Sequence, residues 1–443
     1  MTTRNRQISL GAFLMATGHH VAAWRHPQVP ADAGQNFSHY KHLAQVAEAA
    51  KFDALFIADS IAAPTEQAAS AMARSDLFEP LTLLSALSAV TERIGLIATA
   101  TTSYNEPYHV ARKFASLDHL SGGRSGWNLV TSDAAAEAHN FGRAEHFSHA
   151  QRYSRAREFY EVVTGLWDSW DDDAFIRDKA TGQYYRPEKR HVLDHIGEHF
   201  QVKGPLNVAR SPQGQPVVVQ AGSSEAGQAL AAETAEVVFT AQPSLAAAQQ
   251  FYRGLKARLE RFQRQPEALK IMPGMFVVLG ASQAEAQEKF DALQALVQPE
   301  VGIALLGRML GNFDLSGYPP DQPLPPLPLT DSGQRSRQAL LTQMAAAEQL
   351  TLAQLGRKIA GGRGHYSLIG TPAQVADELQ AWFEEGAADG FNILLPHLPA
   401  GLEDVARYLV PELQRRGLFR QDYSGTTLRD HLGLAKPALR VRT

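Results

Sequence analysis

A run of small and hydroxyl-bearing residues, AGSSEAGQALAAETA at 221–235, is well suited to hold an anion. It follows an apolar run and opens a helix-forming stretch, which places Ser223 and Ser224 in the first turn of a helix. Backbone N–H groups there have no partner within the helix, and the helix dipole also favours negative charge. The segment predicts either a phosphate site or a simple helix cap. It is not a Walker loop, because Gln228 and not lysine follows Gly227.

Polar side chains also stand at the ends of three other apolar runs. If these ends meet at one edge of a sheet, they form a hydrogen-bonding surface for a ligand rich in carbonyl groups and ring nitrogens. Capping of the following turn is the alternative for each residue on its own. The residues are Asp59 after ALFIA, Thr101, Thr102 and Ser103 after RIGLIATA, and Asn128, Thr131 and Ser132 in and after WNLV.

Two groups of histidines could transfer protons, since histidine titrates near neutral pH. His19 and His20 lie with Arg25 in the loop GHHVAAWRHP, and Arg25 suggests an anionic substrate. His397 follows the last apolar run and could point into the same region. Elsewhere, His149 lies four residues before a tyrosine at the start of a helix, so the two rings share a face.

The tyrosine of that pair is Tyr153, and both rings could donate to a phosphate or a ring oxygen; surface packing is the alternative.

A third group, His191, His195 and His199, has a spacing that would resemble a metal face on a helix. Val192 and Gly197 oppose a helix there, so no metal site is expected. The chain has no cysteine, which excludes disulfides, thiolate nucleophiles and iron–sulfur ligation.

The apolar runs alternate with longer amphipathic stretches along the chain. This alternation predicts a parallel sheet covered on both faces, and eight strands favour a closed (β/α)8 TIM barrel over an open Rossmann sheet, whose G-x-G-x-x-G fingerprint is absent. The expected strands are 7–13, 54–59, 93–101, 124–132, 216–222, 236–241, 270–281 and 391–396. The expected helices are 38–50, with Ser38 as its cap, 79–91, 107–120, 148–170, 244–264 and 371–386, with a further alanine-rich helix between the fifth and sixth strands.

We expect a single domain over residues 1–443 with two long insertions after strands, at about 171–215 and 297–370. Active sites of such barrels lie at the carboxyl ends of the strands, so both insertions are expected to cover the substrate, with inert surface insertions as the alternative. The proline-rich run at 318–329 must be extended. A polar tail at about 421–443 is expected to wrap a neighbouring subunit or to be mobile.

The composition is that of an ordinary globular protein, with 44% apolar and 20% charged residues and a net charge of −4. It lacks the excess of lysine and arginine that is typical of nucleic-acid-binding proteins, and it lacks the low hydrophobicity and high charge of disordered proteins. No apolar run approaches the ~18–20 residues of a membrane span, and the first residues do not form a signal peptide. We therefore expect a cytoplasmic protein.

Several longer segments, taken together, are specific to one family. Over about residues 7–420 the chain resembles the flavin-dependent monooxygenases of the bacterial-luciferase superfamily, and more narrowly the nitrilotriacetate, dibenzothiophene-sulfone and long-chain-alkane monooxygenase group. The segments are GHHVAAWRHP (18–27), FDALFIADS (52–60), EPYHVARKFASLDHLSGGRSGWNLVTS (106–132), NFG (140–142), RYSRAREFYEVVTGLWDSW (152–170) and VKGPLNVARSPQGQPVVVQAGSSEAG (202–227).

This resemblance implies a barrel that binds reduced FMN at the carboxyl ends of its strands. Asp59, Thr102 and Asn128 match residues near the isoalloxazine ring; the family often has Thr-Thr-Tyr where this chain has Thr102-Ser103-Tyr104. The remaining matches lie on the phosphate and ribityl side, and they are His149, Tyr153, Ser223 and Ser224.

The resemblance also implies a two-component reaction. A separate NAD(P)H:flavin reductase would supply FMNH2, O2 would be the co-substrate, and one oxygen atom would pass to a small organic substrate, which we expect to contain sulfur or carboxylates. His20 or His19, and after them His397, are the candidates for proton control. A homodimer or homotetramer is expected. The alternatives are a deazaflavin-dependent oxidoreductase, a non-catalytic flavin-binding protein and a phosphosugar-handling barrel.

Overall fold

Eight parallel strands close into a barrel, as the alternation of apolar runs predicts. The computed structural model of the protein describes residues 6–64, 67–132, 134–328 and 335–440. The barrel strands are β1 (Ser9–Phe13), β2 (Ala54–Ile57), β3 (Gly95–Thr101), β4 (Ser125–Val130), β7 (Val217–Gln220), β8 (Val237–Thr240), β9 (Lys270–Leu279) and β11 (Gly390–Leu394). Each pairs in parallel with its neighbours, and β9 closes the circle between β8 and β11. All the carboxyl ends therefore meet at one mouth.

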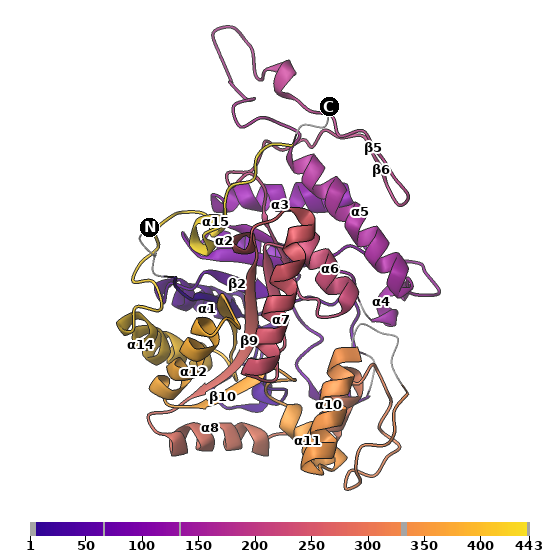
Figure 1. The fold of residues 1–443 in the computed structure, drawn as a ribbon, viewed down its shortest axis with the longest axis vertical. Coiled ribbons are helices and arrows are strands. Elements are labelled where there is room, and N and C mark those ends of the chain that lie inside the picture. Colours follow the sequence, from indigo (N-terminus) through magenta and orange to yellow (C-terminus); the bar gives the residue numbers. More distant parts are fainter. Residues whose placement is uncertain (1–5, 65–66, 133, 329–334, 441–443) are drawn as a thin grey trace.

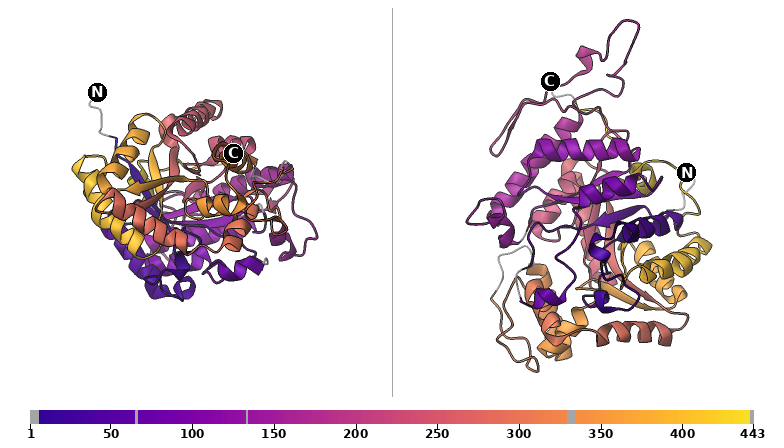
Figure 2. Two further views of the ribbon diagram at one scale, coloured as in Figure 1. Left: turned by 90° about the horizontal axis from the view of Figure 1, so that it is seen from below. Right: turned by 180° about the vertical axis from the view of Figure 1, so that it is seen from behind.

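Helices cover the outside of the barrel and return the chain from each strand to the next (Figure 1, Figure 2). They are α1 (Phe37–Ala49), α2 (Pro80–Ser88), α3 (Pro107–Ser121), α5 (His149–Trp167), α6 (Glu225–Thr234), α7 (Leu245–Arg258), α8 (Gln283–Ala295), α12 (Pro372–Glu384), α13 (Ala400–Asp404) and α14 (Val410–Arg415). Proline at the first position starts α2, α3 and α12, where its missing N–H costs nothing. The cap of α1 is Asn36, which accepts from the His39 N–H at 3.1 Å, and not Ser38.

The 297–370 insertion folds at the mouth of the barrel and forms three helices and one strand within its described residues. It contains α9 (Pro299–Met309), α10 (Arg335–Glu348), α11 (Leu352–Ile359) and the strand β10 (Tyr366–Gly370). Its apolar side chains pack against Val21 and Met72, from the loops after β1 and β2. β10 pairs with the distal half of β9, beyond the point where β8 leaves it. The expectation that this segment lies on the active-site side is consistent with that packing.

The 171–215 insertion lies at the opposite end of the molecule, so its expected placement over the substrate is wrong. Helix α5 begins at the mouth and runs back along the barrel, and the chain after Trp167 therefore starts at the amino ends of the strands. Figure 1 shows this segment projecting beyond the end of α5, with the short strands β5 (His195–Ile196) and β6 (Gln201–Val202). It precedes β7 and does not follow a strand of the barrel.

The tail packs on its own barrel instead of extending away from it. Helix α15 (Leu428–Leu432) places Leu428 so close to β3 that a Cβ on Gly95 would lie 2.4 Å from it. Leu428, Leu432 and Leu434 belong to the same buried cluster as Ile97 inside the barrel. The tail thus closes the amino end of the barrel. None of the helices in the described ranges has both the length and the apolarity needed to cross a bilayer.

One buried cation joins three elements near that closed end. Arg124, at the start of β4, is only 2% exposed, and its guanidinium makes five hydrogen bonds. The acceptors include the carbonyls of Ser88 at the end of α2, Ser121 at the end of α3 and Ile94 before β3. Every N–H of the planar group has a partner, which a lysine could not reproduce.

We predict that Arg124→Lys lowers the free energy of unfolding by about 3 kcal/mol, because carbonyl groups that arginine satisfies would remain buried without a donor. The measurement is the midpoint of urea unfolding, with tryptophan fluorescence as the signal. Arg258→Lys is the matched control: Arg258 pairs with the exposed Glu225, and its replacement should change stability by no more than about 0.5 kcal/mol. Equal midpoints for the two variants would contradict the role assigned to Arg124.

Candidate active site

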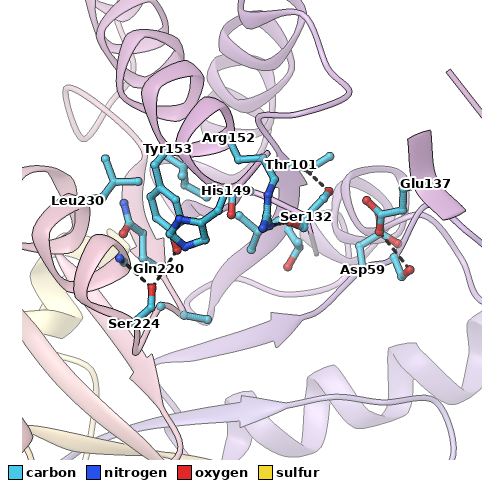
Figure 3. A pocket seen from close by; sticks show the side chains of 18 of the residues that line it. Asp59, Thr101, Ser132, Glu137, His149, Arg152, Tyr153, Gln220, Ser224 and Leu230 are labelled. Atoms are coloured by element: carbon cyan, nitrogen blue, oxygen red, sulfur yellow. Dashed lines mark hydrogen bonds between the residues drawn. The ribbon is translucent and has the colours of Figure 1, made fainter. Parts of the chain in front are cut away.

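A cavity of about 300 Å³ opens at the mouth, over the ends of β2, β3, β4 and β7 (Figure 3). The first turns of α5 and α6 form its wall. Of the residues expected from sequence to bind a cofactor, Asp59, His149, Tyr153, Ser223 and Ser224 line it, whereas Thr102 and Asn128 do not. The other polar side chains of the lining are Ser60, Thr99, Thr101, Thr131, Ser132, Glu137, Arg152 and Gln220.

The start of α6 forms one end of this cavity. Ser224 caps the helix, with its Oγ accepting from the Gly227 N–H at 3.1 Å. The Ser223 hydroxyl lies 3.3 Å from the hydroxyl of Thr240. A Cβ on Gly222 would lie 3.0 Å from the Cα of Gly227, so this tight turn leaves little room for a side chain at either position. Two hydroxyls and the free N–H groups of a helix start thus surround one point, as an anion site requires.

The start of α5 faces this point from the other side. Tyr153 places its hydroxyl 3.3 Å from Ser224 Oγ, and its ring lies 4.7 Å from that of His149. Arg152, between them in sequence, is 5% exposed and donates to the Ser132 carbonyl (Figure 3). Arg152 is not among the site residues expected from sequence, although its spacing of three residues from His149 puts it on the same helix face. It brings a positive charge into the wall of the cavity.

The interior wall of the barrel supplies hydrogen-bonding groups below the cavity. Asn128 is 3% exposed and donates to the Thr99 hydroxyl at 2.8 Å. Its Oδ1 has no hydrogen-bond partner within the part of the chain that the structure describes. A buried acceptor without a donor is costly, so a ligand N–H there would be stabilising.

On β3, Thr99 and Thr101 face the cavity, whereas the expected Thr102 does not. Thr101 lines the cavity, and its hydroxyl lies 2.8 Å from that of Ser132. Thr102 is fully buried and donates to the Val130 carbonyl at 3.2 Å. Successive side chains along β3 alternate between the barrel interior and the helix layer, so a shift of one position changes the face. Thr101 and not Thr102 is therefore placed to meet a ligand.

Acidic side chains form the other end of the cavity. Asp59 and Glu137 both line it, and the hydroxyl of Ser60 donates to Glu137 at 3.3 Å. Burial raises the pKa of Asp59 to about 6, and the Glu79 and Glu137 carboxylates act in the same direction. Asp59 can therefore gain or lose a proton close to neutral pH.

The candidate catalytic histidines do not line this cavity. The ring of His19 lies edge-on to Phe13, 4.5 Å between centroids, beside the carboxyl end of β1. His20 turns toward α8, where its ring lies 6.4 Å from that of Phe290, and its Nδ1 accepts from the Ala22 N–H. This packing does not support the expected role of His20 at the cavity. The side chain of His19 packs on β1, whereas that of His20 points away toward α8.

His397 packs against another histidine, with 4.3 Å between its ring centroid and that of His26. Burial lowers the pKa of His20 and of His397 to about 4. Burial also lowers the pKa of His19 well below its usual range, and nearby guanidinium groups add to this effect. All three rings are neutral at pH 7, so none of them supplies a standing positive charge.

The arrangement suits one class of ligand. It combines an anion site at one end, a planar hydrogen-bonding surface along the strand ends, and a titratable carboxyl at the other end. A phosphorylated heteroaromatic cofactor has complementary groups in that order.

Comparisons with known proteins point to the same class. Residues 12–389 match the family model of the luciferase-like monooxygenases. N-acetyl-S-(2-succino)cysteine monooxygenase of Bacillus subtilis (strain 168) is 52% identical over 441 residues, 99% of each chain. Nitrilotriacetate monooxygenase component A of Aminobacter aminovorans is 49% identical over 442 residues, 98% of each.

A solved structure extends the similarity to the fold. The crystal structure of riboflavin lyase with modified FMN and the substrate riboflavin matches with a TM-score of 0.87 and 31% identity, covering 98% of this chain and 97% of that one. These matches confirm the family resemblance and the barrel that the sequence predicts. The chain belongs to the luciferase-like monooxygenase family, and it is a monooxygenase.

Proposed function

We propose that this protein is the oxygenating component of a two-component system that uses FMNH2 and O2. One observation carries the proposal: a single cavity joins the anion site at the start of α6 to the hydroxyl, amide and carboxyl groups at the strand ends. The absence of a G-x-G-x-x-G fingerprint agrees with a separate NAD(P)H:flavin reductase. The relative named component A supports such a division of labour. A cytoplasmic homodimer or homotetramer remains our expectation.

The phosphate of FMN would be held at the start of α6. Ser223 and Ser224 supply hydroxyl donors, and Tyr153 and His149 close the site from α5. Arg152 would balance the negative charge, since its side chain is buried in the same wall. These contacts are charge-assisted, which makes them stronger than neutral hydrogen bonds.

The isoalloxazine would lie over the strand ends, with Asn128 Oδ1 accepting from a ring N–H. Bound reduced FMN supplies the electrons with which O2 is activated and one oxygen atom is inserted into an organic substrate. The protein orients the ring and excludes water from it. Asp59 stands at the acidic end, where its carboxyl can hold a proton below about pH 6 and release it above.

The substrate that we propose is a small sulfur-containing or carboxylated molecule. The two relatives compared above are named for N-acetyl-S-(2-succino)cysteine and nitrilotriacetate, which both carry carboxylates. Loop segments after β1 and β2 and the 297–370 insertion enclose the other half of the mouth, where such a molecule would approach the ring.

The proposed function predicts tight binding of FMNH2 in an anaerobic titration and, on mixing with O2, a reoxidation slower than that of free flavin. Stopped-flow absorbance measures this reoxidation. Reduced deazaflavin is the comparison ligand. Preferential binding of deazaflavin would favour the deazaflavin-dependent alternative, and unaltered reoxidation without product formation would indicate a flavin-binding protein.

We predict that Ser224→Ala weakens FMNH2 binding about tenfold, because one hydrogen bond to the phosphate is lost. Ser224 also caps α6, so the variant should lose about 1 kcal/mol of stability for that reason alone. Ser282→Ala is the matched control, since Ser282 caps α8 in the same way, at 3.1 Å from the Glu285 N–H, outside the cavity. The hypothesis fails if both variants bind FMNH2 equally.

A third prediction follows from the raised pKa of Asp59. The folded protein binds this proton more tightly than the unfolded chain, so Asp59 destabilises the fold increasingly as pH rises from about 4 to about 6. The stability of Asp59→Asn relative to wild type should therefore increase over that window and then level off. Thermal unfolding of the FMN-free protein at pH 4 to 8 measures this.

Asp422→Asn provides a control of opposite sign. The Lys51 ammonium lowers the pKa of Asp422, so that carboxylate stabilises the fold at neutral pH and loses its effect on acidification. A pH-independent difference between Asp59→Asn and wild type would show that the Asp59 carboxyl titrates normally.

A further inference from the structure

Positively charged and imidazole side chains gather over the half of the mouth that the cavity leaves uncovered. We call them the basic cluster. They come from three segments that are far apart in sequence: the loop after β1, the loop after β2 and the 297–370 insertion. The members are His19, Arg74, Arg308, Arg363 and His365.

Direct contacts hold these segments together at the end of β1. Arg74 donates to the Gly18 carbonyl at 3.1 Å, which places its guanidinium beside His19. The Val21 N–H donates to the Ala360 carbonyl at 2.8 Å and so ties the first loop to the end of α11. The cluster therefore has a fixed position relative to the barrel.

Aromatic side chains of the barrel lie under the cluster. His19 packs on Phe13 of β1, and His365 stacks on Phe239 of β8, with 5.1 Å between ring centroids. Phe13 and Phe239 are in contact with each other, 5.4 Å apart. The mouth thus has an apolar floor on this side, in contrast to the polar strand ends under the cavity.

Two cations of the basic cluster, Arg74 and Arg308, lack a negative partner among the described residues. Arg74 Nη1 and both ring nitrogens of His19 are buried and have no hydrogen bond to any described residue. Neither Arg74 nor Arg308 forms an ion pair with a carboxylate of residues 6–64, 67–132, 134–328 or 335–440. Burial and the charge of Arg308 lower the pKa of Arg74 to about 10. A buried cation without a counter-charge is unfavourable, and an anion that binds beside it removes the cost.

We propose that Arg74, supported by Arg308 and His19, anchors a carboxylate of the substrate in the half of the mouth formed by β1 and β8. This assignment rests on the proposed function, because it takes the flavin to occupy the cavity over β2, β3, β4 and β7. A guanidinium binds a carboxylate through two parallel hydrogen bonds, and the aromatic floor suits the carbon skeleton. Arg74 is then a specificity-determining residue.

The arginine that the sequence suggested for an anionic substrate has another role. Arg25 is exposed and donates to the carbonyl of Leu296, so it fastens the first loop to the end of α8. Arg74 comes from a loop whose sequence, AMARSDLF, carries no recognisable motif. Only the fold brings its charge to the mouth.

The test is isothermal titration of the FMN-loaded protein with tricarballylate, a tricarboxylate that is not readily oxidised, and with its uncharged triamide. Wild type should bind tricarballylate and not the triamide. Arg74→Gln should weaken that binding about tenfold or more, the loss expected for a charge-assisted hydrogen bond. The tricarballylate affinity of Arg74→Lys should lie between those of wild type and Arg74→Gln, because lysine keeps the positive charge and loses the two parallel N–H donors of the guanidinium.

Arg25→Gln is the matched control and should bind tricarballylate as wild type does. The affinity for FMN, measured in each variant, shows whether the cavity is intact; unchanged FMN binding with weakened tricarballylate binding supports the assignment. If Arg74→Gln does not fold, Arg308→Gln gives the same comparison from a different segment.

Equal tricarballylate binding in Arg74→Gln and wild type, or binding of the triamide as tightly as of the acid, would overturn the carboxylate anchor and leave the flavin proposal intact. Failure of wild type to bind FMN would instead reject the proposed function.

Discussion

Parallel closure of the barrel is the constraint on which the site depends. Eight strands running in one direction bring eight carboxyl ends to one mouth, although these ends are spread over almost 400 residues of sequence. β9 makes the closure possible, because its first residues pair with β8 while its middle pairs with β11. Within the circle, β2, β3, β4 and β7 are consecutive neighbours, so Asp59 and Ser224 face the same cavity from its two ends.

The mouth divides into two chemically different halves. Over β2, β3, β4 and β7 the lining is rich in hydroxyl, amide and carboxyl groups, and below it the amide oxygen of Asn128 has no donor among the described residues. Over β1 and β8 the floor is aromatic and the groups above it are basic. A cofactor and a substrate of different character can therefore occupy neighbouring places without competing.

Sequence alone predicts the barrel well, because each of its eight strands is a short apolar run followed by a helix. It also finds the start of α6, where small and hydroxyl residues are adjacent in the chain. It cannot fix which threonine of β3 faces inward, since a shift of one residue reverses the face. It cannot place the 171–215 insertion, because the length of α5 carries the chain to the far end. The position of Arg74 at the mouth cannot be predicted either, because it depends on contacts with segments that are distant in sequence.

The closure of the barrel's amino end by α15 bears on the order in which the chain can fold. Leu428, Leu432 and Leu434 complete the interior cluster, yet a ribosome delivers them after all eight strands. Until they emerge, the nascent barrel has an incomplete core whose apolar residues face solvent. A segment that is made after all the barrel strands thus supplies the side chains that seal the interior, and chains that stop before α15 should be targets for chaperones and proteases.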